Sequence, residues 1–213
     1  MSPQDFVTNW EDALQRLKTG NERFVNGLCS ADSLISRDRL RDLSKQGQKP
    51  FAIILSCSDS RFPAEIVFDH GIGTLFVIRV AGNVIQPSQL ASIEFAVDGL
   101  GTPLCVVMGH TQCGAIRSAV EVAGTGVMPS SKNLRALIEL ILPAVDEAKR
   151  EESQSSPEKL IYEATVRNVI RMGKVILENS PLVAEYYHKQ KFGLLGAIFD
   201  VETGHISFEL GKS

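Results

Sequence analysis

Two short motifs of this 213-residue chain contain residues that bind metals. The first covers residues 57–61 (sequence CSDSR), and the second covers residues 110–114 (sequence HTQCG). Thiolate sulfur and imidazole nitrogen are ligands that Zn²⁺ takes in tetrahedral sites. The motifs therefore supply three candidate metal ligands, which are Cys57, His110 and Cys113.

The fourth ligand decides what such a metal site can do. Asp59 lies two residues after Cys57, so its carboxylate can reach the same metal and close the site. Arg61 offers a planar fork that can hold this carboxylate with two hydrogen bonds. If Arg61 holds Asp59 off the metal, water can bind, and zinc lowers the pKa of that water toward neutrality. The residues alone leave both a catalytic and a structural site open.

Each motif has a simpler explanation when it is taken alone. A cysteine at a strand end is often only a small buried apolar residue, and Cys105 inside an apolar run is expected to be one. A thiol phosphatase fits poorly, because the spacing from Cys113 to Arg117 is shorter than its phosphate-binding loop requires. The two motifs together, with the Asp-x-Arg pair, favour a metal site.

Both motifs follow apolar runs that are typical of buried parallel strands, residues 51–55 and 104–108. Residues 74–80 show the same pattern, and residues 88–98 are typical of a helix. Strands that alternate with helices predict right-handed βαβ units. Since parallel strands bring their carboxyl ends to one edge of a sheet, the two motifs are expected to converge there.

The second half of the chain predicts helices, followed by a hairpin. Helices are expected over residues 115–123, 133–150, 157–179 and 181–191. A turn at residues 202–205 separates two apolar runs and predicts an antiparallel edge strand. The predicted fold class is α/β, with about four parallel strands and one antiparallel edge strand in a sheet flanked by α-helices.

The N-terminal region predicts helices outside this sheet. Apolar residues recur at helical spacing over residues 2–26, with Gly20 as the expected break between two helices, and residues 34–46 suggest a solvated helix. We expect one domain over residues 1–213, with an N-terminal helical arm over 1–45 and an α/β core over 46–213.

The amino-acid composition argues against some classes of partner and cellular location. The chain is 44% hydrophobic, which supports a substantial core, and its net charge of −3 provides no basic field for nucleic acid or an anionic membrane. Four unevenly spaced cysteines favour reduced thiols and a cytoplasmic location. No signal peptide or membrane span is expected, and a small anionic or neutral substrate remains open.

The motifs resemble those of the β-class carbonic anhydrases. Residues 57–65 (CSDSRFPAE) and 110–114 resemble the two metal-binding signatures of that family, and residues 76–83 (FVIRVAGN) resemble the segment between them. The resemblance extends from about Leu14 to Leu210. It implies a zinc lyase with one Zn²⁺ per chain that interconverts carbon dioxide and bicarbonate.

The resemblance also implies roles for individual residues. Cys57, His110 and Cys113 would hold the zinc, with Asp59 as a ligand only in a closed, inactive state. In the open state Asp59 would pair with Arg61 and orient the zinc-bound hydroxide by accepting its hydrogen bond.

Substrate contacts and assembly follow from the same resemblance. Gln48 would hydrogen-bond a substrate oxygen, while the Gly114 backbone and the Phe76 side chain would line the pocket. The family forms homodimers, often paired into homotetramers, whose N-terminal helices embrace the neighbour. Trp10 fits such an arm, although it also fits a core position.

One position separates two subgroups of the family. A bicarbonate-regulated subgroup has Trp three residues before the first zinc cysteine, where this chain has Ile54, while Arg79 is common to both subgroups. We therefore expect the plant-like, non-regulated type. Two alternatives are a hydrolase of carbon disulfide or carbonyl sulfide on the same scaffold, and a non-catalytic zinc module with Asp59 as permanent ligand.

Overall fold

A five-stranded sheet forms the centre of the computed structural model, which describes residues 9–29, 36–151 and 156–210. The strand order is β2-β1-β3-β4-β5. The strands span Leu75–Arg79 (β2), Ala52–Ser56 (β1), Leu104–His110 (β3), Gly193–Phe199 (β4) and Ile206–Leu210 (β5). The first four are parallel and β5 is antiparallel to β4, which confirms the predicted fold class and the terminal hairpin.

The central strands are apolar because both of their faces are covered. Every residue of β1 and β3 is buried. Successive side chains of a strand point to opposite faces, so Ile53 and Leu55 enter one hydrophobic cluster while Ala52 and Ile54 enter the other. The continuous apolar runs that predicted these strands therefore result from burial on two sides.

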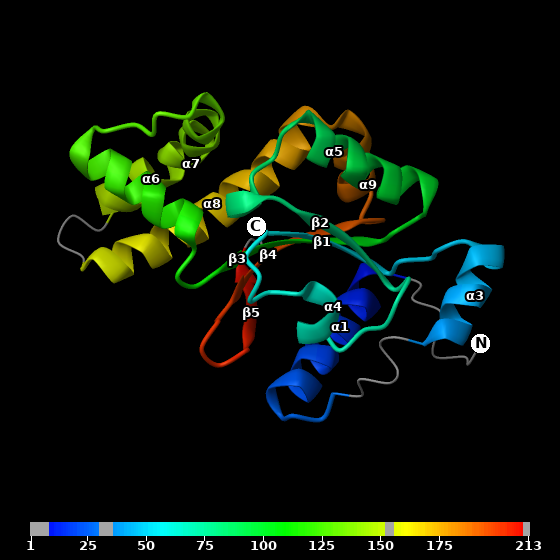
Figure 1. The fold of residues 1–213 in the computed structure, drawn as a ribbon. Coiled ribbons are helices and arrows are strands. Elements are labelled where there is room, and N and C mark those ends of the chain that lie inside the picture. Colours follow the sequence, from blue (N-terminus) through cyan, green and yellow to red (C-terminus); the bar gives the residue numbers. More distant parts are fainter. Residues whose placement is uncertain (1–8, 30–35, 152–155, 211–213) are drawn as a thin grey trace.

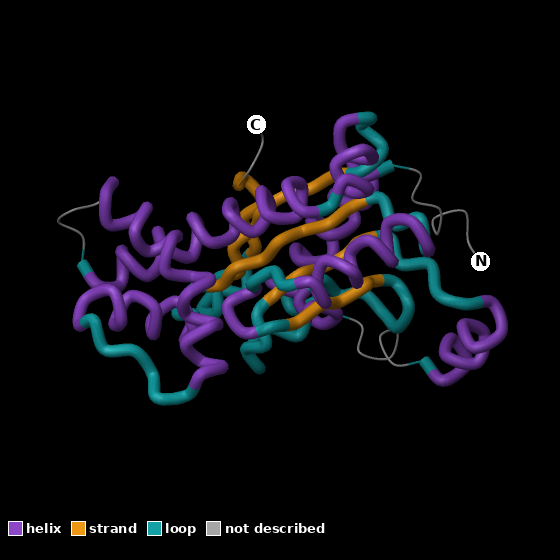
Figure 2. Tube along the Cα trace, turned by 90° about the horizontal axis from the view of Figure 1, so that it is seen from above, coloured by secondary structure: helices purple, strands orange, loops and turns teal. Residues whose placement is uncertain are grey.

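Helices form a layer on each face of the sheet (Figure 1). One layer contains α1 and α4. The other contains α5, α8 and α9, and α6 and α7 extend it beyond the strands (Figures 1 and 2). The helices are α1 (Trp10–Val25), α3 (Arg37–Gln46), α4 (Ala64–Val67), α5 (Pro87–Glu94), α6 (Gly114–Thr125), α7 (Lys132–Glu151), α8 (Pro157–Asn179) and α9 (Pro181–His188), with a 3₁₀ turn η2 (Ala81–Asn83) and a π-turn η3 (Phe95–Gly99).

Helix α1 runs through Gly20 without interruption, so the break predicted at that glycine is wrong. The glycine has another function, because a Cβ at this position would lie 1.8 Å from the carbonyl oxygen of Phe68. The two neighbours of Phe68 are also bound by α1: Asn21 donates to Val67 O, and Arg23 pairs with Asp69. A missing side chain thus lets α1 pack directly on the backbone that follows α4.

The N-terminal region divides into two unlike helices. Ala13 and Leu17 of α1 are buried against the sheet of their own chain, and Trp10 is half-buried. Helix α3 has no buried residue, as the expected solvated helix requires, and Figure 1 shows it standing away from the sheet. The division into an arm and a core stays a prediction, and residues 1–8 and 30–35 lie outside the described structure.

Candidate metal centre

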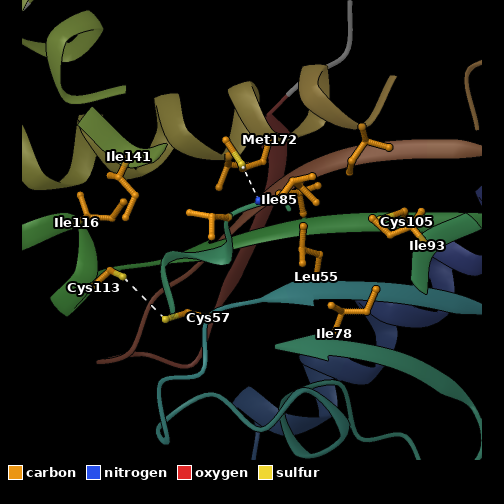
Figure 3. Packing of buried hydrophobic residues seen from close by; sticks show 14 of the residues in the cluster. Leu55, Cys57, Ile78, Ile85, Ile93, Cys105, Cys113, Ile116, Ile141 and Met172 are labelled. Atoms are coloured by element: carbon orange, nitrogen blue, oxygen red, sulfur yellow. Dashed lines mark hydrogen bonds between the residues drawn. The ribbon is translucent and has the colours of Figure 1, made fainter. Parts of the chain in front are cut away.

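The two motifs meet at one edge of the sheet, as predicted from the strand ends. Strands β1 and β3 are neighbours, with Ser56 level with Met108, so Cys57 and His110 follow at the same end. Cys113 lies at the N-cap of α6. The ligand atoms of Cys57, His110 and Cys113 all lie within 4.8 Å of one another, and Figure 3 shows the two thiols facing each other, 4.0 Å apart.

The His110 ring is held in an orientation that suits a metal ligand. Its Nδ1 lies 2.9 Å from the carbonyl oxygen of Thr111 and must carry a proton to donate to it. In the neutral ring, the buried Nε2 is then the nitrogen with a free lone pair, and it has no hydrogen-bond partner among the described residues. A bound cation would satisfy this nitrogen, which otherwise costs free energy as a buried polar atom.

Thr111 in turn is fixed by the end of the sheet. Its N–H donates to Phe199 O over 2.9 Å, and its hydroxyl accepts from Val201 N over 3.0 Å. Strand β4 therefore determines where the Thr111 carbonyl lies and thus how the His110 ring is turned. This role is not visible in the sequence, since only the pairing of β3 with β4 brings residue 111 to residues 199–201.

The hydrogen bond between the two thiols makes Cys57 easier to ionise and Cys113 harder to ionise. The pKa of Cys57 is lowered to about 4, chiefly because Cys113 donates a hydrogen bond to its sulfur, with a further bond from the Gly82 N–H, against the effect of burial. The pKa of Cys113 is raised, because its hydrogen bond to Cys57 and its burial both favour the thiol. A divalent cation between the sulfurs would favour the loss of both protons and bind both cysteines as thiolates.

Arg61 holds the carboxylate of Asp59 at the side of the three ligands. Its Nε and Nη2 donate to Oδ1 and Oδ2, each over 2.9 Å, and its backbone N–H donates to Oδ1 over 3.0 Å. These bonds lower the pKa of Asp59 to about 2, the Arg61 side chain having the largest effect. Asp59 Oδ2 lies 3.9 Å from His110 Nε2, so an ionised carboxylate borders the candidate metal position.

Arg79 supports the first motif from the neighbouring strand. Its Nη2 donates to Asp59 O over 2.6 Å and its Nε donates to Cys57 O over 3.3 Å. In the sequence, Arg79 is notable only as a residue that two subgroups of the resembled family share. Its two bonds to backbone carbonyls give it a second role, which is to fix the path of the chain between Cys57 and Asp59.

The other expected site residues divide into two groups. Gly114 directly follows Cys113 and begins α6. Gln48 is exposed and precedes β1, whereas Phe76 is paired with Ile53, four residues and about 13 Å before Cys57 along the strand. One chain therefore brings Gly114 to the ligands but leaves Gln48 and Phe76 at the opposite end of β1.

The fold and the donor set define an α/β protein with a buried Cys₂His set that could hold a metal ion, at the carboxyl edge of its parallel strands. The family model described as carbonic anhydrase matches residues 52–206. The chain belongs to the β-class carbonic anhydrases, and it is a carbonic anhydrase enzyme.

Relatives from bacteria and fungi support this assignment. The chain is 36% identical to carbonic anhydrase 2 of Mycobacterium tuberculosis over 197 residues, which cover 92% of the chain and 91% of the relative. The structure of the β-carbonic anhydrase CafA of Aspergillus fumigatus matches with a TM-score of 0.73 at 25% identity, covering 83% of each chain. The β-carbonic anhydrase CcaA matches with a TM-score of 0.73 at 27% identity, covering 94% of this chain and 92% of that one.

Proposed function

We propose that this enzyme uses zinc to hydrate carbon dioxide reversibly to bicarbonate and a proton. The observation that carries the proposal is the buried set of Cys57, His110 and Cys113, with Asp59 held beside it by Arg61. Among the described residues, the imidazole nitrogen of this set that faces the other ligands has no hydrogen-bond partner. Two thiols and an imidazole suit Zn²⁺ better than the hard cations Mg²⁺ or Ca²⁺. The donor set therefore fits the cofactor that the family implies.

Zinc held by these three residues would lower the pKa of a water ligand and supply hydroxide near neutral pH. Asp59 would accept a hydrogen bond from the attacking oxygen and direct it at carbon. Arg61 would keep Asp59 in that role by occupying both carboxylate oxygens, which supports the open, non-regulated type. The α6 backbone at Gly114 would border the space for carbon dioxide, a small neutral molecule that needs little more than an apolar pocket.

We infer that a second copy of the chain completes the site. Within one chain, β1 separates Gln48 and Phe76 from the metal ligands, so they can contact substrate only in a neighbour's site. Exposed Phe95, whose ring lies 6.3 Å from that of Phe76, adds apolar surface at this end of the sheet. The proposal is thus a homodimer, or a homotetramer built from dimers.

We also propose a cytoplasmic location. Its support is chemical, since the two thiols of the centre must stay reduced to bind metal. Among the helices that the structure describes, none has the length and apolar character needed to cross a bilayer.

The test is carbon dioxide hydration by the zinc-loaded enzyme, followed by stopped flow from pH 6.5 to 9. We expect activity that rises smoothly with pH in the wild type and is absent in Cys57→Ala, which lacks one ligand. A wild type as inactive as this variant, with one zinc per chain, would contradict the proposal. It would point instead to a closed four-ligand site or to a substrate such as carbon disulfide or carbonyl sulfide.

A further inference from the structure

Helix α8 holds the loop that contacts the first metal ligand. The Asn168 side chain is fully buried, and its Nδ2 donates to Gly82 O over 2.8 Å. Four residues later on the same helix face, Met172 Sδ accepts from Ile85 N over 3.2 Å, as the dashed line in Figure 3 marks. The segment from Gly82 to Ile85 is therefore attached to α8 at both ends.

The same loop makes a direct contact with the metal centre. The Gly82 N–H donates to Cys57 Sγ over 3.4 Å. Gly82 has a φ of 67°, and a Cβ there would lie 2.8 Å from Ile141 Cδ1 and 3.3 Å from Ala115 Cβ. Glycine suits both this backbone conformation and this space, because any side chain would strain the backbone and displace Ile141. Gly82 thus packs between Ala115 of α6 and Ile141 of α7, and its carbonyl accepts a hydrogen bond from α8.

The two polar atoms of the Asn168 amide differ in their hydrogen bonding. Its Oδ1 is buried and has no hydrogen-bond partner among the described residues, which is costly at a fully buried position. Exchanging the amide oxygen and nitrogen would place Oδ1 against Gly82 O, so the donor must face Gly82. An apolar residue would fill the same space without burying an unsatisfied acceptor. The presence of asparagine therefore indicates that its hydrogen bond to Gly82 O outweighs this cost.

We propose that Asn168 is a positioning residue for the metal centre, acting through Gly82 on the thiolate of Cys57. By holding the Gly82 carbonyl, Asn168 fixes the angle at which the Gly82 N–H meets the sulfur. This bond withdraws charge from the thiolate and orients its lone pairs. The inference rests on the proposed metal site, and it adds a residue some 110 positions from Cys57 in sequence to the partners that tune it.

Cobalt substitution tests this role without measuring turnover. The wild type loaded with Co²⁺ should show a sulfur-to-cobalt charge-transfer band. In Asn168→Leu the band should move to longer wavelength, because a thiolate that has lost its hydrogen bond gives up an electron more easily. Zinc affinity, measured by competition with a chromophoric chelator, should fall about 10–100-fold, as is usual when an outer partner of a metal ligand is removed.

Thr165→Val is the matched control. Thr165 is buried one turn earlier on α8, and its hydroxyl donates within the same helix, to Ile161 O. Its loss should lower stability while leaving the band and the zinc affinity unchanged. If Asn168→Leu does not fold, Asn168→Ala takes its place, since alanine suits a helix interior.

Two outcomes would overturn the inference, and they are distinguishable. If the folded Asn168 variants keep the wild-type band and zinc affinity and lose only stability, Asn168 is a structural residue and the proposed function is untouched. If the wild type itself shows no charge-transfer band and binds no zinc, the metal site fails, and both the proposed function and the role of Asn168 fail with it.

Discussion

The two ends of β1 differ in how much of a site one chain assembles. At the carboxyl end, the three ligands and the Asp59–Arg61 pair meet within a few ångströms. At the amino end, Gln48 is exposed and contacts no metal ligand, and Phe76 lies against Phe95. One chain thus brings together the candidate metal ligands but not the residues expected to contact substrate, and the proposed second copy would join the two sets.

The largest expected effect comes from removing a ligand at the carboxyl end. His110→Ala deletes the nitrogen that has no hydrogen-bond partner among the described residues, so zinc binding should be lost and activity should fall to the uncatalysed rate. Metal analysis of the purified variant, together with stopped-flow hydration, measures both. Gln48→Ala is the control from the amino end and should keep its full zinc content. A His110→Ala enzyme that retains zinc and activity would show that the carboxyl end of β1 is not the metal site.

Freeing Asp59 should inactivate the enzyme without removing its metal. In Arg61→Leu the carboxylate loses both side-chain hydrogen bonds and becomes available to the zinc. Activity at pH 7.5 should fall at least about 100-fold, as when a group that orients the reacting atoms is lost. A crystal structure should show Asp59 at a zinc-ligand distance of about 2.0–2.2 Å.

The wild type is the control for this variant. Crystals of the zinc-loaded wild type near pH 7.5 should retain the Asp59–Arg61 pair. If Asp59 binds the zinc in the wild type, the prediction of the non-regulated type is wrong. An Arg61→Leu enzyme of normal activity would show that the pair is not needed to keep the site open.

The amino end can be tested by complementation between copies. Gln48→Ala should lower kcat/KM about 10-fold by removing one hydrogen bond to the substrate, with zinc content unchanged. Mixed dimers of Gln48→Ala and Cys57→Ala contain one site with an intact metal centre and an intact Gln48. After unfolding and refolding an equal mixture, activity should reach about a quarter of the wild type. Activity that does not exceed that of refolded Gln48→Ala at the same dilution would place Gln48 outside the neighbour's site.

Sequence reasoning predicted the carboxyl end of β1 better than the amino end. Cys57 and His110 follow uninterrupted apolar runs, and the rule that parallel strands share an edge is enough to bring them together. No comparable rule places Gln48 or Phe76, since their distance from the ligands depends on strand register and on how chains assemble. The resemblance assigned both residues to the pocket, whereas the single chain leaves them apart from it.

The contacts that shape the metal centre were also beyond sequence reasoning. Gly82 is one of many glycines, and only its positive φ and its crowded surroundings reveal why it is needed. Asn168 lies in a helix predicted from its apolar spacing, in which a polar residue would be expected to face solvent. Such roles depend on contacts between residues far apart in the chain, and these become visible only when the helices are packed on the sheet.

The smallest expected effect is a pH-dependent contribution of the Asp59–Arg61 pair to stability. The pKa of Asp59 is lowered to about 2 from an ordinary value of 3.8, chiefly by Arg61, so the folded state favours the ionised form. The pair therefore stabilises the fold above about pH 4, and this contribution is lost as the pH falls toward 2. Because Arg61 is partly exposed, we expect about 1 kcal/mol or less.

Urea unfolding of metal-free wild type and Asp59→Asn measures this contribution. The difference in unfolding free energy should be constant from pH 8 to 5 and shrink at pH 3. Asp200, whose pKa is also lowered, by backbone N–H groups of Thr203 and Glu202, is present in both proteins and cancels in the difference. A difference that stays the same down to pH 2.5 would mean that Asp59 is not held as an ionised partner of Arg61. The proposal that this pairing keeps the carboxyl end of β1 open to water would then lose its support.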